Sequence, residues 1–196
     1  MFTTRYTRRD LTLANAFTVL RIVLIPFFGW LWYRGENERA LWIFGIAAAT
    51  DLLDGFLARW LNQKSPLGAL LDPMADKMLV FVALIVGMLL GEIPVWLAVV
   101  IIARDALLAA GAIAFSTRWR DRHGPSEWRP TRIGKYAMFM QTVSIVLVIV
   151  DSTLGPSGLR GYVEVAMLWT AALTAIAGVQ YILRAARTLR QDTIAA

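Results

Sequence analysis

The chain has 196 residues, a formal net charge of +6, a hydrophobic fraction of 58% and a mean hydropathy of +0.56. This profile is typical of a membrane protein with several spans and argues against an ordinary soluble domain. Cysteine is absent and His123 is the only histidine, so the sequence excludes disulfides, thiolate metal sites and multi-histidine zinc sites.

In chain order, residues 2–12 carry aromatic and apolar side chains among three arginines, which predicts a short interfacial helix on an anionic membrane surface. Six apolar segments, each long enough for a membrane span, follow at 15–33, 40–61, 68–90, 94–116, 132–151 and 160–186. Tight turns are predicted at 91–94 and at 151–158. The predicted fold is therefore an all-α, polytopic membrane protein of about six transmembrane helices, with a single domain over residues 1–196.

Basic residues predict the side of the membrane on which each connection lies. Four groups fall on one side of a six-span chain: before the first span, after the second, in the polar loop 117–131, and at the C-terminus. The opposite side has only Arg34, Arg39 and Arg160. The positive-inside rule then places both termini and the 117–131 loop in the cytoplasm. We expect an integral protein of a bacterial inner membrane, with the lipid bilayer and no nucleic acid as its surroundings.

Four aspartates, Asp51, Asp54, Asp72 and Asp76, interrupt the second and third apolar segments. A charged side chain at the centre of a bilayer costs roughly 2.5–3.5 kcal/mol, so these carboxylates need compensation. Each pair is spaced by three or four residues and therefore shares one helix face. The short connection at 62–67 makes the two spans antiparallel neighbours, so the four carboxylates can surround one pocket near the cytoplasmic ends of the spans.

A pocket with only oxygen ligands suits Mg²⁺ or Mn²⁺. Four carboxylates can hold two divalent cations, and two-metal sites commonly handle phosphoryl chemistry. Gly55, Ala58 and Gly68 are small residues on or beside these faces and would let a ligand approach the backbone closely. Arg59 lies one residue from the face and could contact a phosphate oxygen.

Residues 51–76 read D-L-L-D-G-F-L-A-R-W-L-N-Q-K-S-P-L-G-A-L-L-D-P-M-A-D. They match the signature D-x₂-D-G-x₂-A-R-x₈-G-x₃-D-x₃-D at every defined position, and the chain thereby resembles the CDP-alcohol phosphotransferases. The stretch from Asn15 to Arg21 resembles the start of bacterial and organellar members, although Ala14 stands where those members usually have proline. The resemblance covers nearly the whole chain and implies a homodimer.

By this resemblance, a hydroxyl attacks the diacylglycerol-side phosphorus of a CDP-linked lipid, CDP-diacylglycerol, and CMP leaves. The resemblance implies that Asp51, Asp54 and Asp72 hold two divalent cations at the diphosphate. Asp76 would accept the proton of the attacking hydroxyl and would also contact a metal. The residues implied in CDP-lipid binding are Gly55, Ala58, Arg59, Gly68, Asn15 and Arg21.

Three further segments, 104–112, 129–135 and 168–181, resemble CMP-forming cardiolipin synthases. Phosphatidylglycerophosphate synthases look similar over 11–76, but they more often have Arg-Glu where this chain has Arg104-Asp105. No further charge follows up to Phe115, and a dianionic acceptor would need more cations. The predicted acceptor is phosphatidylglycerol, giving cardiolipin; the alternative is glycerol 3-phosphate, giving phosphatidylglycerophosphate. The candidate acceptor-binding residues are Arg104, Asp105, Lys135, Arg132 and Arg118.

Other classes of protein remain open from the residues alone. The aspartates could belong to an ion-pair network with Lys77 and Arg104, or to the proton path of an ion-coupled transporter. Intramembrane prenyltransferases also use aspartate-rich motifs with Mg²⁺, but their motifs lie in two separate helix pairs. The single tandem motif at 51–76 argues against that class.

Overall fold

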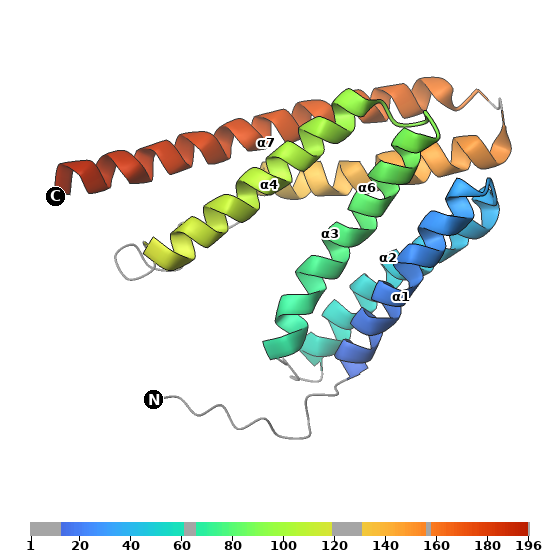
Figure 1. The fold of residues 1–196 in the computed structure, drawn as a ribbon, viewed down its shortest axis with the longest axis horizontal. Helices are drawn as coiled ribbons and strands as arrows, with labels where there is room; N and C mark the ends of the chain where they lie inside the picture. The colour runs from blue at the N-terminus through green and yellow to red at the C-terminus, as the bar shows by residue number, and fades with distance from the viewer. Residues whose placement is uncertain (1–12, 61–65, 119–130, 156–157, 196) are drawn as a thin grey trace. The chain divides into compact units, whose positions relative to one another are not determined.

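The computed structural model describes residues 13–60, 66–118, 131–155 and 158–195. Within those ranges the chain forms α-helices and no strand (Figure 1), so the predicted all-α class is confirmed there. The predicted interfacial helix over 2–12 lies outside the described residues. The six helices are α1 (Leu13–Tyr33), α2 (Asn37–Trp60), α3 (Pro66–Leu89), α4 (Val95–Arg118), α6 (Arg132–Leu154) and α7 (Arg160–Ala195).

The helices begin and end within about one turn of the predicted segments, with one exception. The predicted last segment stops at residue 186, whereas α7 continues to Ala195. The added residues contain neither glycine nor proline, so nothing in them breaks a helix when the apolar run ends. The apolar run therefore underestimated the length of α7.

The turn between α3 and α4 is where the sequence predicts it. Gly91 has a φ of +72°, a left-handed conformation that favours glycine. The predicted turn at 151–158 is shorter than expected, because α6 continues through Asp151 and ends only at Leu154. Gly155 follows with a φ of +70°, so the helix ends at the glycine rather than at the aspartate.

Two helices are long and apolar enough to cross a membrane, judged by length and composition. They are α6 over its whole length and α7 from Arg160 to Ala186. Shorter apolar stretches occur at Thr18–Tyr33 in α1 and Lys77–Leu89 in α3. The described residues thus support a helical membrane protein, and the prediction of six spans stays a prediction.

The helices fall into two compact units. The first contains α1, α2 and α3 together with the end of α6 at Ser152–Gly155. Helix α1 packs against both α2 and α3. The side-chain amide of Asn37 donates a hydrogen bond to the carbonyl oxygen of Ser152 at 2.9 Å, which joins the start of α2 to the end of α6.

Aromatic side chains fill the core of the first unit. The ring of Phe28 lies 5.6 Å from that of Trp32 and 5.3 Å from that of Phe44, between ring centroids. All three side chains are buried. This contact fixes the α1–α2 pair, because tilted aromatic pairs at such distances add to the stability gained from burial.

The second unit contains α4, α6 up to Asp151, and α7. Helices α4 and α7 pack together. Helices α6 and α7 are joined by buried hydrogen bonds, between Ser144 and Thr170 at 2.9 Å and between Gln141 and Thr174 at 3.5 Å. Polar side chains that pair between apolar helices stabilise their association modestly in a membrane. These two hydrogen bonds therefore help to hold α6 against α7.

Candidate active site

Three helix ends meet at one end of the first unit. Figure 1 shows the N-terminal end of α1, the C-terminal end of α2 and the N-terminal end of α3 at the same end of this unit. The short turn at residues 34–36 between α1 and α2 makes these two helices antiparallel. The 51–76 motif occupies two of the three ends, so the fold brings both halves of the motif to one place.

The buried face of α1 changes from apolar to polar side chains towards this end. Along the helix it passes through Trp32, Phe28 and Ile25, all apolar, to Arg21 and Thr18. Arg21 and Thr18 are both 0% exposed. A guanidinium removed from water is costly unless negative charge or hydrogen-bond acceptors surround it. The buried face of α1 thus carries a cation, Arg21, near this end, and Arg21 is one of the residues that the sequence predicts for CDP-lipid binding.

The buried stripes of α2 and α3 lead to the aspartates by helix register. In α2 the buried residues Ala40, Phe44 and Ala47 are spaced by four and three, and the same spacing continues to Asp51 and Asp54.

In α3 the buried residues Val86, Ala83 and Leu79 lead back in the same way to Asp76 and Asp72. The side chains of all four aspartates lie outside the described part of the structure. So do the side chains of the other predicted CDP-lipid residues, Asn15, Gly55, Ala58, Arg59 and Gly68.

The donor set of the motif fits hard divalent cations. Four carboxylates supply only oxygen, the ligand that Mg²⁺ and Mn²⁺ prefer, and the whole chain contains no cysteine and a single histidine. Among the side chains that the structure describes, no three acidic, histidine or cysteine residues gather as metal ligands. The motif aspartates, whose side chains lie outside that part, stay the predicted metal ligands.

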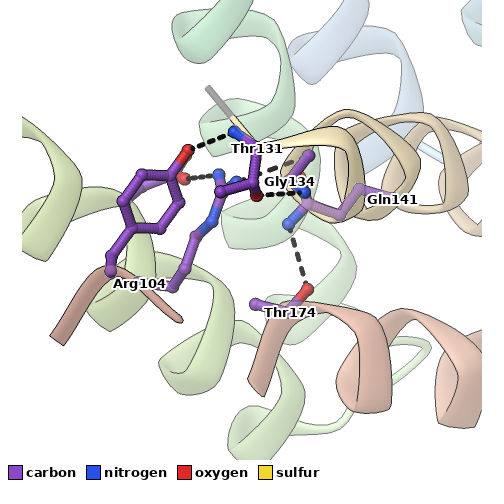
Figure 2. Close-up of polar contacts among 7 residues, drawn as sticks. Arg104, Thr131, Gly134, Gln141 and Thr174 are labelled. Atoms are coloured by element: carbon purple, nitrogen blue, oxygen red, sulfur yellow. Dashed lines mark hydrogen bonds and ion pairs between the residues drawn. The ribbon is translucent and has the colours of Figure 1, made fainter. Parts of the chain in front are cut away.

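The predicted pair Arg104–Asp105 lies in the second unit. The Nη1 of Arg104 donates to Oδ1 of Asp105 at 2.7 Å, and its Nη2 donates to the carbonyl oxygen of Gly134 at 3.4 Å (Figure 2). Arg104 is only 6% exposed, and its Nε has no hydrogen-bond partner among the described residues. Both terminal nitrogens of this arginine are thus engaged within the protein, and its predicted contact with the acceptor stays a prediction.

Arg132 and Lys135 lie on the first turn of α6 and are both exposed. Arg118 is the last residue of α4, and its side chain lies outside the described part. The structure therefore presents two of the five predicted acceptor residues as accessible cations on one helical turn.

The structure also brings together residues that were not singled out as site residues. The backbone N–H of Thr131 donates to the hydroxyl of Tyr181 at 3.1 Å, and the hydroxyl of Thr131 accepts from the N–H of Gly134 at 2.9 Å. These residues belong to segments 129–135 and 168–181, and Arg104 begins segment 104–112. The three segments that resemble cardiolipin synthases therefore meet in one buried polar cluster, and that resemblance was the only signal in the sequence that could have found it.

Comparison with known proteins gives the same family as the motif. The model of the CDP-alcohol phosphatidyltransferase family matches residues 11–177. The cardiolipin synthase (CMP-forming) of Rattus norvegicus is 44% identical over 110 residues, which cover 56% of this chain and 36% of the rat protein. The chain thus spans about a third of the length of that relative.

Two bacterial relatives match along nearly the whole chain. A probable phosphatidylglycerophosphate synthase of Mycobacterium tuberculosis is 36% identical over 92% of this chain and 85% of its own length. The cardiolipin synthase (CMP-forming) of Streptomyces coelicolor is 32% identical over 96% of this chain and 89% of its own length. Members of the matched family use CDP-diacylglycerol and an alcohol acceptor, and they generally depend on divalent cations. The chain belongs to the CDP-alcohol phosphatidyltransferase family.

Proposed function

We propose that this protein transfers the phosphatidyl group of CDP-diacylglycerol to phosphatidylglycerol, forming cardiolipin and CMP. The observation that carries the reaction class is the complete motif of eight defined positions within residues 51–76, and all eight positions belong to the adjoining ends of α2 and α3. The family match over residues 11–177 supports the same class.

In the proposed reaction the acceptor hydroxyl oxygen forms a bond to the diacylglycerol-side phosphorus. The bond between that phosphorus and the bridging diphosphate oxygen breaks, and CMP carries the electron pair away. Asp76 accepts the proton of the attacking hydroxyl as general base. Arg21, buried at the same end of the first unit, and Arg59 would supply positive charge to the anionic diphosphate.

Asp51, Asp54 and Asp72 would hold two divalent cations, with Asp76 as a further ligand. When bound, these cations supply charge neutralisation for the leaving diphosphate oxygen. Without bound cations, the four carboxylates on these two neighbouring spans would repel one another. This repulsion favours the binding of cations of high charge. Mg²⁺ and Mn²⁺ both meet these requirements.

The choice of acceptor rests on the second unit. The described part of segment 104–112 carries one buried arginine, which is paired to its neighbouring aspartate. That leaves Arg132 and Lys135 as the exposed cations on the first turn of α6. One or two cations suit the single phosphodiester charge of phosphatidylglycerol, whose acyl chains also bring apolar binding energy. Glycerol 3-phosphate remains the second candidate because relatives of both names match the chain.

We further propose that all six helices span the inner membrane of a bacterium and that the protein is a homodimer. The charge distribution predicts cytoplasmic termini, and the helix count of the described residues is even, as this orientation requires. Large apolar side chains such as Trp42, Phe81, Phe139 and Trp169 are exposed on the chain. Lipid or a second copy of the chain would cover such surfaces.

Release of CMP from CDP-diacylglycerol tests the reaction class. Purified protein in mixed micelles with Mg²⁺ would receive CDP-diacylglycerol together with phosphatidylglycerol and glycerol 3-phosphate. CMP release that depends on an acceptor is the expected result. A prenyltransferase or a transporter would release no CMP under these conditions, and that outcome would overturn the proposal.

A further inference from the structure

The first turn of α6 is capped by its own N-terminal residue. Thr131 precedes α6, and its hydroxyl accepts the N–H of Gly134 at 2.9 Å. Threonine is a favoured residue at this position because its oxygen satisfies a backbone donor that has no partner within the helix. The carbonyl oxygen of Thr131 also accepts the N–H of Lys135 at 3.1 Å. Thr131 therefore determines the backbone of the turn that carries Lys135.

Two other helices hold this cap in place. The N–H of Thr131 donates to the hydroxyl of Tyr181 on α7 at 3.1 Å. From α4, Arg104 donates to the carbonyl oxygen of Gly134 at 3.4 Å (Figure 2). Thr131, Arg104 and Tyr181 are 7%, 6% and 3% exposed, respectively. Because these residues are buried, loss of the Tyr181 hydroxyl leaves the N–H of Thr131 without that acceptor and with little access to water.

Gly134 is the point on which the three side chains converge. A Cβ atom built on Gly134 would lie 3.1 Å from Nη2 of Arg104, 3.1 Å from Oγ1 of Thr131 and 3.3 Å from the hydroxyl oxygen of Tyr181. All three distances are shorter than ordinary van der Waals contacts. A side chain at this position would push the three polar groups away by a few tenths of an ångström, so glycine favours their close approach to the backbone.

The turn fixed in this way is the one that carries the exposed cations. Thr131, Gly134 and Ala137 are buried, whereas Arg132 and Lys135 are exposed on the same turn. The buried side of the turn is thus tied to α4 and α7, and its exposed side presents positive charge.

We infer that Arg104, Thr131, Gly134 and Tyr181 form a positioning clamp, which holds Arg132 and Lys135 in place for the phosphodiester anion of the acceptor lipid. This inference rests on the proposed function. In this role the four residues act through the backbone of the first turn of α6 and need no contact with the substrate. Pre-ordering the cations lowers the cost of acceptor binding, so loss of the clamp raises the KM for the acceptor more than it changes kcat.

The substitution Tyr181→Phe tests the clamp, because it removes one hydroxyl and keeps the ring. In mixed micelles with CDP-diacylglycerol, we expect the KM for phosphatidylglycerol to rise about fivefold, the factor that corresponds to one hydrogen bond of ordinary net strength. The KM for CDP-diacylglycerol and kcat stay within about twofold. An unchanged acceptor KM overturns the clamp.

Two control variants separate positioning from general loosening. Tyr162→Phe makes the same change on α7 at a residue that is 69% exposed. Thr170→Val removes another buried bond between α6 and α7, the one to Ser144. Both controls keep the wild-type acceptor KM. A rise with Thr170→Val equal to that with Tyr181→Phe would show a general loosening of the helix pair and overturn the clamp.

A second pair of variants covers the case in which Tyr181→Phe fails to fold. Thr131→Ser keeps the capping hydroxyl and the wild-type acceptor KM, whereas Thr131→Val loses the hydroxyl and raises the KM. Equal values for the two variants overturn the clamp. The wild-type protein is assayed with each acceptor, and the one it converts is used throughout. If it converts neither, the proposed reaction fails, and if it converts only glycerol 3-phosphate, the proposed acceptor fails. If it converts phosphatidylglycerol and the variants behave alike, only the clamp fails.

Discussion

Gly29 of α1 lies so close to Val82 of α3 that a Cβ atom on the glycine would stand 2.7 Å from Cγ1 of the valine. Real side chains do not approach to this distance, so the two helices can pack as they do only because residue 29 has no side chain. This contact fixes the spacing of α1 and α3. The buried Arg21 and the motif aspartates of α3 lie on the continuation of these same two helices.

The substitution Gly29→Ala is therefore expected to destabilise the protein by about 1–3 kcal/mol, the usual cost of overpacking. A lower midpoint of thermal unfolding in detergent is the measurement. Gly45→Ala is the matched control, because no described atom lies within 4 Å of its added Cβ, and it leaves the midpoint unchanged or slightly higher. Adding Val82→Ala to Gly29→Ala restores part of the loss. An equal loss with both glycine variants would mean that the close contact is not the cause.

Metal removal is expected to abolish activity. The oxygen-only donor set of the motif and the cation dependence of the family motivate this prediction. CMP release should stop in excess EDTA and return when Mg²⁺ or Mn²⁺ is added beyond the chelator. Zn²⁺ is the control cation and should restore less activity, since the motif offers no nitrogen or sulfur ligand. Full activity after exhaustive chelation would contradict the metal assignment.

The four aspartates are expected to differ in what their loss impairs. Asp51→Asn, Asp54→Asn and Asp72→Asn should weaken binding of metal and CDP-diacylglycerol together. Asp76→Asn should lower kcat by about 10²–10⁴-fold, the usual contribution of a general base, with a smaller change in affinity for CDP-diacylglycerol. Isothermal titration and steady-state rates measure the two effects. Loss of affinity alone in Asp76→Asn would remove this residue from the role of base.

The charge distribution predicts a topology that single cysteines can test, because the chain has no native cysteine. A cysteine at Glu38, an exposed residue at the start of α2, should react with an impermeant reagent added outside intact cells. A cysteine at Ser126, in the predicted cytoplasmic loop, should react only after the membrane is opened. Reaction of the Ser126 cysteine in intact cells would reverse the predicted orientation.

The helices and the motif could be predicted from the sequence alone. Apolar segments and helix breakers predicted where five of the helices end, because these are local properties. The tandem motif predicted the family, and the family match confirms it. The predicted end of α7 at residue 186 was wrong, because residues 187–195 contain no helix breaker and the helix continues past the apolar run.

The contacts of Arg104 could not be predicted from the pattern of residues within one helix. Adjacent residues of a helix do not face one another, yet the long side chain of Arg104 reaches Asp105 at 2.7 Å. Its contact with Gly134 joins positions 30 residues apart, and that between Thr131 and Tyr181 joins positions 50 residues apart. Such contacts depend on how helices pack. Periodicity within one helix carries no information about them, so the positioning clamp emerged only from the fold.

The identity of the lipid product tests the central claim most directly. Purified protein would receive CDP-diacylglycerol, Mg²⁺ and either phosphatidylglycerol or glycerol 3-phosphate, and mass spectrometry would identify the lipids formed. The proposed function predicts cardiolipin and CMP from phosphatidylglycerol, with little product from glycerol 3-phosphate. Phosphatidylglycerophosphate from glycerol 3-phosphate, with no cardiolipin from phosphatidylglycerol, would contradict the choice of acceptor.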